Sequence, residues 1–412
     1  MAFNPIQEKG TPLEKQFHSW SDINVTPYDK NTVHPYTRTR IILMNGIEVD
    51  AALFKHHFNR HTDNIAVKKQ LALTRAIEQQ QQKMVNWLVP ANESTLEVTI
   101  GYEQVAVDLT AYLARTEPDP YVKSALDFAL LEDFDHLYRY ANLMEMTEGK
   151  KAESIVKDLT EITPGRPTYA EHRYPSDNLT RPYNASRADI LTKLHVATIT
   201  AGEQQTMNFY MNVGNRALDM LGRGLYAEIA MVEEEHVSHY ESLADPTVSW
   251  FEMLVLHEYN ECYLYYSFMT TEPDNRIKQI WERHLHEEIE HLRIAREMMK
   301  QYERRDPADV MLPSELPALT IFQSNKDYVR QVLASQVDYM ESDMKFLPMA
   351  EVEDKSRYQK YQKAANDGLD FIPSQKVIEE NIRQNRQDYR LETEGPNPVE
   401  SLQSREKVTV LR

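Results

Sequence analysis

Apolar residues recur at helical spacing along most of the chain, and proline-containing breaks separate the segments that show this pattern. Strand-like alternation is scarce. The pattern predicts helices over 63–88, 94–115, from the break at 117–120 to about 147, 187–213, from the glycines at 222–224 to about 244, on both sides of the break at 271–274, and 327–344. The sequence therefore predicts an all-α protein.

Segments without this periodicity suggest how the chain is divided. Residues 1–62 are polar and rich in Pro and Tyr, which predicts an N-terminal arm. We expect a helical bundle domain over 63–304, interrupted by an irregular, proline-rich crossover at 149–187. A Pro-rich link and helix over 305–349 and a polar C-terminal tail over 350–412 complete the predicted organisation.

The charge balance narrows the class of protein. The 412 residues include 46 Lys and Arg against 64 Asp and Glu, a net charge of −18, which argues against nucleic-acid binding. A mean hydropathy of −0.61 and the lack of a long apolar run argue against a membrane span. The first residues lack the features of a signal peptide, so we expect a cytoplasmic protein. A lone cysteine, Cys262, excludes an internal disulfide and a Cys-based metal site.

Three Asp/Glu-x-x-His motifs are the strongest chemical signal: Asp133/His136, Glu233/His236 and Glu288/His291. With 14 His and 64 acidic residues, chance alone would produce about two of them. A further glutamate precedes each motif by 30 residues: Glu103, Glu203 and Glu258. The midpoints of the first and third pairs fall on Pro118 and Pro273, where turns are expected. The paired carboxylates would therefore lie level on antiparallel helices.

These acidic residues also lie on apolar helix faces. Leu96, Ile100, Glu103 and Val107 share one face by 3-4 spacing, as does Glu233 with its own apolar neighbours. Carboxylates that converge inside a bundle need cations, because burial of an unpaired charge costs several kcal/mol. A Glu from each of two helices, with Glu-x-x-His from each of two others, is the ligand set of di-iron and di-manganese bundles.

On these residues the sequence resembles the ferritin-like di-metal carboxylate superfamily, which includes rubrerythrins, acyl carrier protein desaturases and the ribonucleotide reductase small subunit. The resemblance implies one half-site of Glu103, Asp133 and His136 and a second of Glu203, Glu233 and His236. The stretches that begin at Ala129 and Ile229 also align with each other, and the proline-rich segment matches the family's long crossover. Asp133 departs from the family, which usually has Glu there.

The third motif leaves the choice of helices open. A site on Glu203, Glu233, His236, Glu258, Glu288 and His291 is an alternative, as are two separate sites or an ion-paired polar seam without metal. The short turn at Asp245-Pro246 is contrary to the family's long crossover. We therefore expect the primary site on the first four helices, with the third hairpin packed beside it. Nearby charged residues are expected at the surface: Glu234, Glu235, His239, His284, His286, Glu287 and Glu290.

The expected fold is thus a ferritin-like four-helix bundle with an additional C-terminal helical hairpin and irregular N- and C-terminal arms. The resemblance implies two iron ions, or a manganese-iron or dimanganese pair, that activate dioxygen to oxidise or oxygenate a small organic substrate. The expected small-molecule partner is dioxygen or peroxide. A reductase partner or the substrate would supply electrons, and a homo-oligomer is expected. The alternative is a ferroxidase, peroxide-scavenging or iron-handling protein without an organic substrate; a purely structural helical protein is a third reading.

Overall fold

The computed structural model describes residues 3–310, 313 and 315–385 and, over these residues, divides the chain into two compact units. Unit 1 is formed by residues up to Asn92, Pro182–Gly202 and Ala244–Phe322. Unit 2 is formed by Glu93–Arg181, Glu203–Leu243 and residues from Gln323 onward. Each unit therefore combines segments that are far apart in the sequence.

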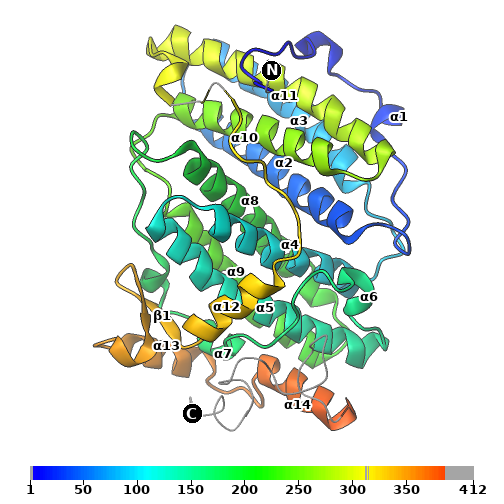
Figure 1. Ribbon diagram of the computed structural model, residues 1–412, viewed down its shortest axis with the longest axis vertical. Helices are drawn as coiled ribbons and strands as arrows, with labels where there is room; N and C mark the ends of the chain where they lie inside the picture. The colour runs from blue at the N-terminus through cyan, green and yellow to red at the C-terminus, as the bar shows by residue number, and fades with distance from the viewer. Residues whose placement is uncertain (1–2, 311–312, 314, 386–412) are drawn as a thin grey trace. The chain divides into compact units, whose positions relative to one another are not determined.

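Unit 1 is built on two antiparallel helix pairs. Helix α2 (Pro35–His61) packs against α3 (Ile65–Asn86), and α10 (Trp250–Thr271) packs against α11 (Asn275–Glu303). Helix α10 also contacts α2, and α11 contacts α3, so the two pairs form a four-helix arrangement (Figure 1). The unit also contains η1 (Leu13–Lys15), α1 (Trp20–Ile23), η4 (Pro307–Val310) and the first part of α8 (Ile190–Val213).

Unit 2 is built on α4 (Thr95–Thr116), α5 (Pro120–Glu148), the last part of α8 and α9 (Met220–Glu241). A core of aliphatic and aromatic side chains, among them Ile100, Phe134 and Ile229, packs between these helices. The crossover between α5 and α8 contains only the short elements α6 (Glu153–Val156), α7 (Thr168–Glu171) and η2 (Pro175–Asn178), and η3 (Gly214–Arg216) follows α8.

The remaining described elements belong to unit 2. They are α12 (Lys326–Gln336), the antiparallel strands β1 (Tyr339–Ser342) and β2 (Lys345–Pro348), η5 (Met349–Glu351), α13 (Ser356–Ala365) and α14 (Pro373–Asn385). Helix α14 packs on α5 and α9. Over the described residues the protein is all-α apart from this one hairpin, which confirms the expected class.

Local signals in the sequence fix the helix ends. Ser94 accepts a hydrogen bond from the backbone N–H of Glu97, whose side chain bonds back to the Ser94 N–H, as the predicted capping box requires. Asp119 caps α5 with Pro120 at its first position, and Gly149 ends this helix in the left-handed region at φ 64°. The turns at 117–119 and 272–274 lie where the sequence placed them.

The structure differs from the expected arms. Residues 35–61 form helix α2, and α13 and α14 lie within the expected C-terminal tail, whose last part, 386–412, lies outside the described residues. Helix α2 was missed because its inward face includes Arg38, Glu48 and Lys55, which weaken the apolar period. The helix expected at 327–344 ends at Gln336, since β1 follows.

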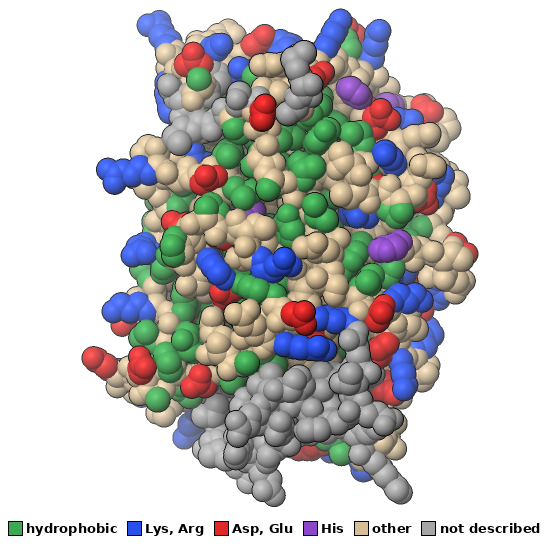
Figure 2. Space-filling model, viewed as in Figure 1, with side chains coloured by type: hydrophobic (Ala, Val, Ile, Leu, Met, Phe, Trp, Pro, Cys, Tyr) green, Lys and Arg blue, Asp and Glu red, His purple; other side chains and the backbone are tan. Residues whose placement is uncertain are grey.

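The face drawn in Figure 2 carries mixed charge. Lys and Arg side chains alternate with Asp and Glu on this face, without separation by sign. Among the described helices, none combines the length and apolarity needed to cross a membrane.

The crossover is held close to α5 at Gly165, which gives a first prediction. A Cβ at this position would overlap the carbonyl oxygen of Leu131 and lie 2.6 Å from the Phe134 ring. We expect Gly165→Ala to destabilise unit 2 by about 1–3 kcal/mol, because the crossover would have to move off α5. Urea denaturation measures this, with Lys151→Ala, at an exposed crossover position, as the control. Equal midpoints for the two variants would contradict this prediction.

Candidate metal centre

Six predicted residues meet inside unit 2. Glu103 comes from α4, Asp133 and His136 from α5, Glu203 from α8, and the last two, Glu233 and His236, from α9. Each is at most 1% exposed. Their ligand atoms form two groups, each within 4.8 Å: Glu103, His136 and Glu233 in one, and Asp133, Glu203 and His236 in the other. Both predicted half-sites therefore contribute to a single buried cluster, named here the unit 2 cage.

Glu233 lies between the two histidines. Its Oε1 is 3.0 Å from the Nδ1 of His136, and its Oε2 is 3.4 Å from the Nδ1 of His236. The His236 Nδ1 also lies 3.5 Å from Asp133 Oδ1 and 3.8 Å from Glu203 Oε2. Because both Nδ1 atoms point into the cage, the two imidazoles present the same atom to the carboxylates.

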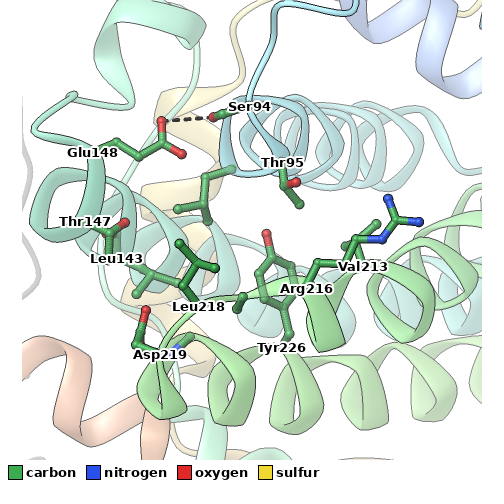
Figure 3. A pocket seen from close by; sticks show the side chains of 13 residues that line it. Ser94, Thr95, Leu143, Thr147, Glu148, Val213, Arg216, Leu218, Asp219 and Tyr226 are labelled. Carbon is green, nitrogen blue, oxygen red and sulfur yellow. Dashed lines mark hydrogen bonds between the residues drawn. The ribbon is translucent and has the colours of Figure 1, made fainter.

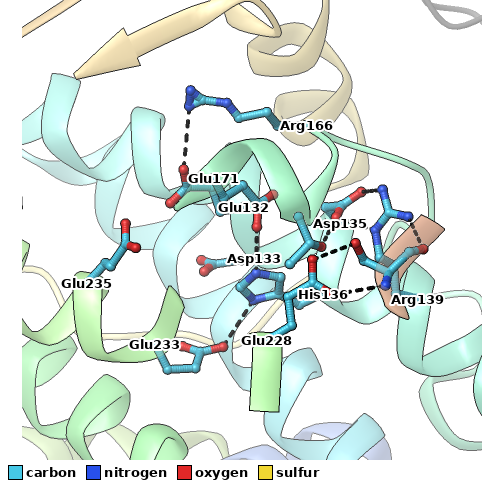
Figure 4. A network of polar contacts seen from close by, with 12 residues as sticks. Glu132, Asp133, Asp135, His136, Arg139, Arg166, Glu171, Glu228, Glu233 and Glu235 are labelled. Atoms are coloured by element: carbon cyan, nitrogen blue, oxygen red, sulfur yellow. Dashed lines mark hydrogen bonds and ion pairs between the residues drawn. The ribbon is translucent and has the colours of Figure 1, made fainter. Parts of the chain in front are cut away.

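The opposite nitrogen of each histidine meets a buried carboxylate outside the cage. His136 Nε2 is 2.9 Å from Glu171 on α7 (Figure 4). His236 Nε2 is 2.9 Å from Glu132 on α5. Glu132 in turn accepts a hydrogen bond from Arg173 at 2.5 Å. Carboxylates that hold the Nε2–H of metal-binding histidines fix the tautomer that leaves Nδ1 free for a metal. Neither residue is predicted from the sequence, because Glu171 lies in the irregular crossover and Glu132 belongs to none of the Asp/Glu-x-x-His motifs.

The cage has more negative charge than its surroundings balance. Among the described residues, Asp133, Glu203 and Glu233 form ion pairs with histidine only. One oxygen of Glu103, Glu203 and Glu233, and both oxygens of Asp133, have no hydrogen-bond partner. Buried acceptors of this kind are costly unless a cation or donor reaches them.

Burial also changes the protonation of the cage. It raises the pKa of Asp133 to about 6 and, with repulsion from Glu233, raises the pKa of Glu103. Burial alone would likewise raise the pKa of Glu233, but His136 and His236 outweigh it and hold that pKa below its ordinary value. The carboxylates thus compete for the few positive charges within reach, which is the situation that metal ions relieve.

Tyrosines connect the cage to a cavity. The hydroxyl of Tyr210 donates a hydrogen bond to Glu103, and its ring centre lies 5.7 Å from that of Tyr226. Tyr140 packs against both rings, at 5.2 and 4.9 Å. Tyr226 lines a cavity of about 320 Å³ together with residues such as Leu143 and Leu218 (Figure 3). This volume suits a small organic molecule.

The third motif lies in unit 1. Glu258, Glu288 and His291 form a buried group with Glu78 of α3, whose ligand atoms also lie within 4.8 Å of one another. Glu78 was missed because it was placed in a helix without a partner. Glu48, 30 residues before it, lay in the expected arm. Glu48 and Glu78 therefore have the same 30-residue spacing as the three predicted pairs.

Four of the expected surface charges are buried. Glu235, His239, His284 and Glu287 are each at most 3% exposed, whereas His286 is exposed. They were misplaced because each has a polar partner that the sequence does not reveal. His239, for example, lies 2.9 Å from Glu341 on β1, a strand that was not predicted.

The contact between Glu171 and His136 supports a second prediction. We expect Glu171→Gln to weaken metal binding at the His136 position by about 10–100-fold, because an amide holds the imidazole less firmly than a carboxylate. Competition with a fluorescent chelator would measure the metal affinities of Glu171→Gln and of the wild type. Glu228→Gln, on α9 and bonded to Ser374, is the control. Equal affinities for Glu171→Gln and the wild type would show that Glu171 does not orient the ligand.

Comparisons with family models, with curated proteins and with solved structures found no match for this chain.

Proposed function

We propose that unit 2 is a dimetal carboxylate centre that activates dioxygen to oxidise or oxygenate a small organic substrate. The observation that supports this most strongly is the cage itself, with four carboxylates and two imidazoles on four helices and unpartnered oxygens directed inward. Hard oxygen and imidazole ligands favour iron or manganese.

The residues present fit two ions. Glu103 and His136 would hold one ion, Glu203 and His236 the other, and Glu233 would contact both, with Asp133 on the His236 side. When bound, a pair of iron or manganese ions supplies one-electron redox chemistry and a place for dioxygen. The negative charge of four carboxylates balances the positive charge of two divalent cations.

The chain's own groups prepare the site for this chemistry. Glu171 and Glu132 hold the Nε2–H of the two histidines. Tyr210 donates a hydrogen bond to Glu103 and fixes which oxygen of that carboxylate faces the cage. Complete burial excludes water, so a reactive oxidant would be directed to a bound substrate rather than to solvent.

The cavity at Tyr226 supports an organic substrate. Its lining combines apolar side chains with polar and charged ones, such as Glu148 and Arg216, and includes Tyr226, which packs on Tyr210 and Tyr140. The described chain offers a single, buried cysteine and therefore no Cys-rich carrier for electrons. Reducing equivalents would come from a partner reductase or from the substrate.

Oxygen uptake by protein loaded with Fe(II) tests this function. Metal-free protein would be loaded anaerobically with about two Fe(II) per chain, exposed to dioxygen and followed with an oxygen electrode. We expect rapid uptake by the wild type and none above background for Glu103→Ala. Absence of uptake by the wild type would contradict the proposal. Continued rapid consumption of excess Fe(II), without an organic substrate, would instead favour the iron-handling alternative.

A further inference from the structure

The helices of the two units match at a constant sequence offset. Adding 55 to residue numbers on α2 and α3 gives their counterparts on α4 and α5, and subtracting 55 from those on α10 and α11 gives their counterparts on α8 and α9. The correspondence pairs Glu48 with Glu103, Glu78 with Asp133, Glu258 with Glu203, Tyr265 with Tyr210, Glu288 with Glu233, and His291 with His236.

The side-chain geometry follows the same correspondence. His291 Nδ1 lies 3.0, 3.6 and 3.9 Å from Glu288, Glu78 and Glu258. The equivalent distances from His236 are 3.4, 3.5 and 3.8 Å. The hydroxyl of Tyr265 donates to Glu48, as that of Tyr210 does to Glu103. Unit 1 therefore contains a second cage of the same design.

Glu78 and Asp133 are both carboxylates, and three further positions differ in chemistry between the cages. Lys55 stands where unit 2 has Thr110, Gln81 replaces His136, and Glu261 replaces Thr206. All three unit 1 side chains are at most 1% exposed. Gln81 Nε2 takes the place of an imidazole nitrogen, since it lies 2.7 Å from Glu288, where His136 lies 3.0 Å from Glu233. An amide nitrogen is a donor and does not ligate a metal.

Lys55 brings a positive charge into the second cage. Its Nζ forms ion pairs with Glu78 and, at 2.8 Å, with Glu258. These two carboxylates, with His291 and Glu288, are the group whose geometry would otherwise suit a metal ion. An ammonium and a divalent cation repel each other strongly at such distances in a buried site, so they compete for the same carboxylates.

We propose that unit 1 is a lysine-filled copy of the metal cage, in which the ammonium of Lys55 takes the place of a metal ion and confines metal binding to unit 2. One half of the copy lacks its imidazole because of Gln81, and the other half contains Lys55. Glu258, Glu288 and His291 then act as partners of an internal cation rather than as metal ligands. The inference about the unit 1 cage does not depend on the reaction proposed for unit 2.

Exchanging the differing residues tests the proposal. Lys55→Thr combined with Gln81→His gives unit 1 the unit 2 residues at these two positions and leaves Glu78 and Glu261 in place. Lys55→Arg is the control that retains the cation. After loading with Mn(II) and desalting, elemental analysis should give about two ions per chain for the wild type and Lys55→Arg, and about four for the double variant. A folded double variant that still binds two ions would overturn the proposal.

The reciprocal exchange, at Thr110 in unit 2, tests the proposal independently in case the double variant does not fold. Thr110→Lys should reduce the Mn(II) content of unit 2 by at least half. Thr110→Met introduces a side chain close to lysine in length but without charge, and should retain more of the Mn(II). Equal contents for these two variants would count against displacement of metal by an ammonium. So would a wild-type chain that holds a third ion that is lost in His291→Ala. If unit 2 binds no metal, the wild type should contain no Mn(II) and the double variant about two ions per chain. That result would support the role of Lys55 and reject the proposed function.

Discussion

Replacing Glu233 by alanine should remove nearly all bound metal, reducing the content from about two ions per chain to below about 0.2. Of the described carboxylates, only Glu233 lies within 3.4 Å of both histidine Nδ1 atoms, so its loss opens both positions together. His236→Ala should have a smaller effect, since it removes a ligand from one position only. Inductively coupled plasma mass spectrometry of desalted protein provides the measurement.

His239→Ala is the matched control for this experiment. His239 lies on the same helix, is equally buried and is a histidine, but its ring contacts Glu341 and the carbonyl oxygen of Ala125 rather than the cage. It should therefore retain about two ions. If Glu233→Ala and His239→Ala lost the same amount of metal, unfolding rather than ligation would explain the loss, and the ligand assignment would be wrong.

Removal of metal is expected to destabilise unit 2 much more than unit 1. A ligand at 1,000 times its dissociation constant adds about 4 kcal/mol of stability, so two ions add several kcal/mol. Without them, four buried carboxylates remain. The described ion pairs of Asp133, Glu203 and Glu233 are with histidine only, and Glu103 accepts a hydrogen bond from Tyr210. Chelation should lower the melting temperature of unit 2 by at least about 10 °C. Unit 1 should be unaffected, because Lys55 remains in its cage.

Hydrogen exchange with mass spectrometry separates the two units. After chelation, peptides from α4, α5 and α9 should lose protection, and peptides from α2, α3, α10 and α11 should retain it. Addition of Mn(II) should restore the original pattern. Equal loss of protection in both units would show that unit 1 also depends on metal, and protection unchanged everywhere would contradict a metal-stabilised unit 2.

Much of the helical framework was predictable, because apolar spacing and local caps act within a few residues. The capping box at Ser94, the proline at 120 and the glycine at 149 fix helix ends by local hydrogen bonds and backbone conformation. Helix α2 shows the limit of this reasoning. Its buried Glu48 and Lys55 are matched by partners on other helices, and hydropathy does not register such pairs.

The six residues of the unit 2 cage were predictable because a 30-residue spacing across a short turn places carboxylates level. The polar contacts around the cage were not predictable from the sequence. Glu171 comes from the irregular crossover and His239 pairs with a hairpin strand, so their partners depend on long-range packing. The division into two units was also hidden, since each unit joins segments separated by more than a hundred residues.

The metal content of the wild-type protein, compared with Glu103→Ala and with the double variant Glu258→Ala/His291→Ala, tests the central claim most directly. All three would be made in cells supplied with iron and manganese and purified without chelators. We predict about two ions per chain for the wild type, most of that amount for the unit 1 double variant, and a large loss for Glu103→Ala. Less than about 0.2 ion per wild-type chain, or metal lost only from the unit 1 variant, would contradict the assignment of the centre to unit 2.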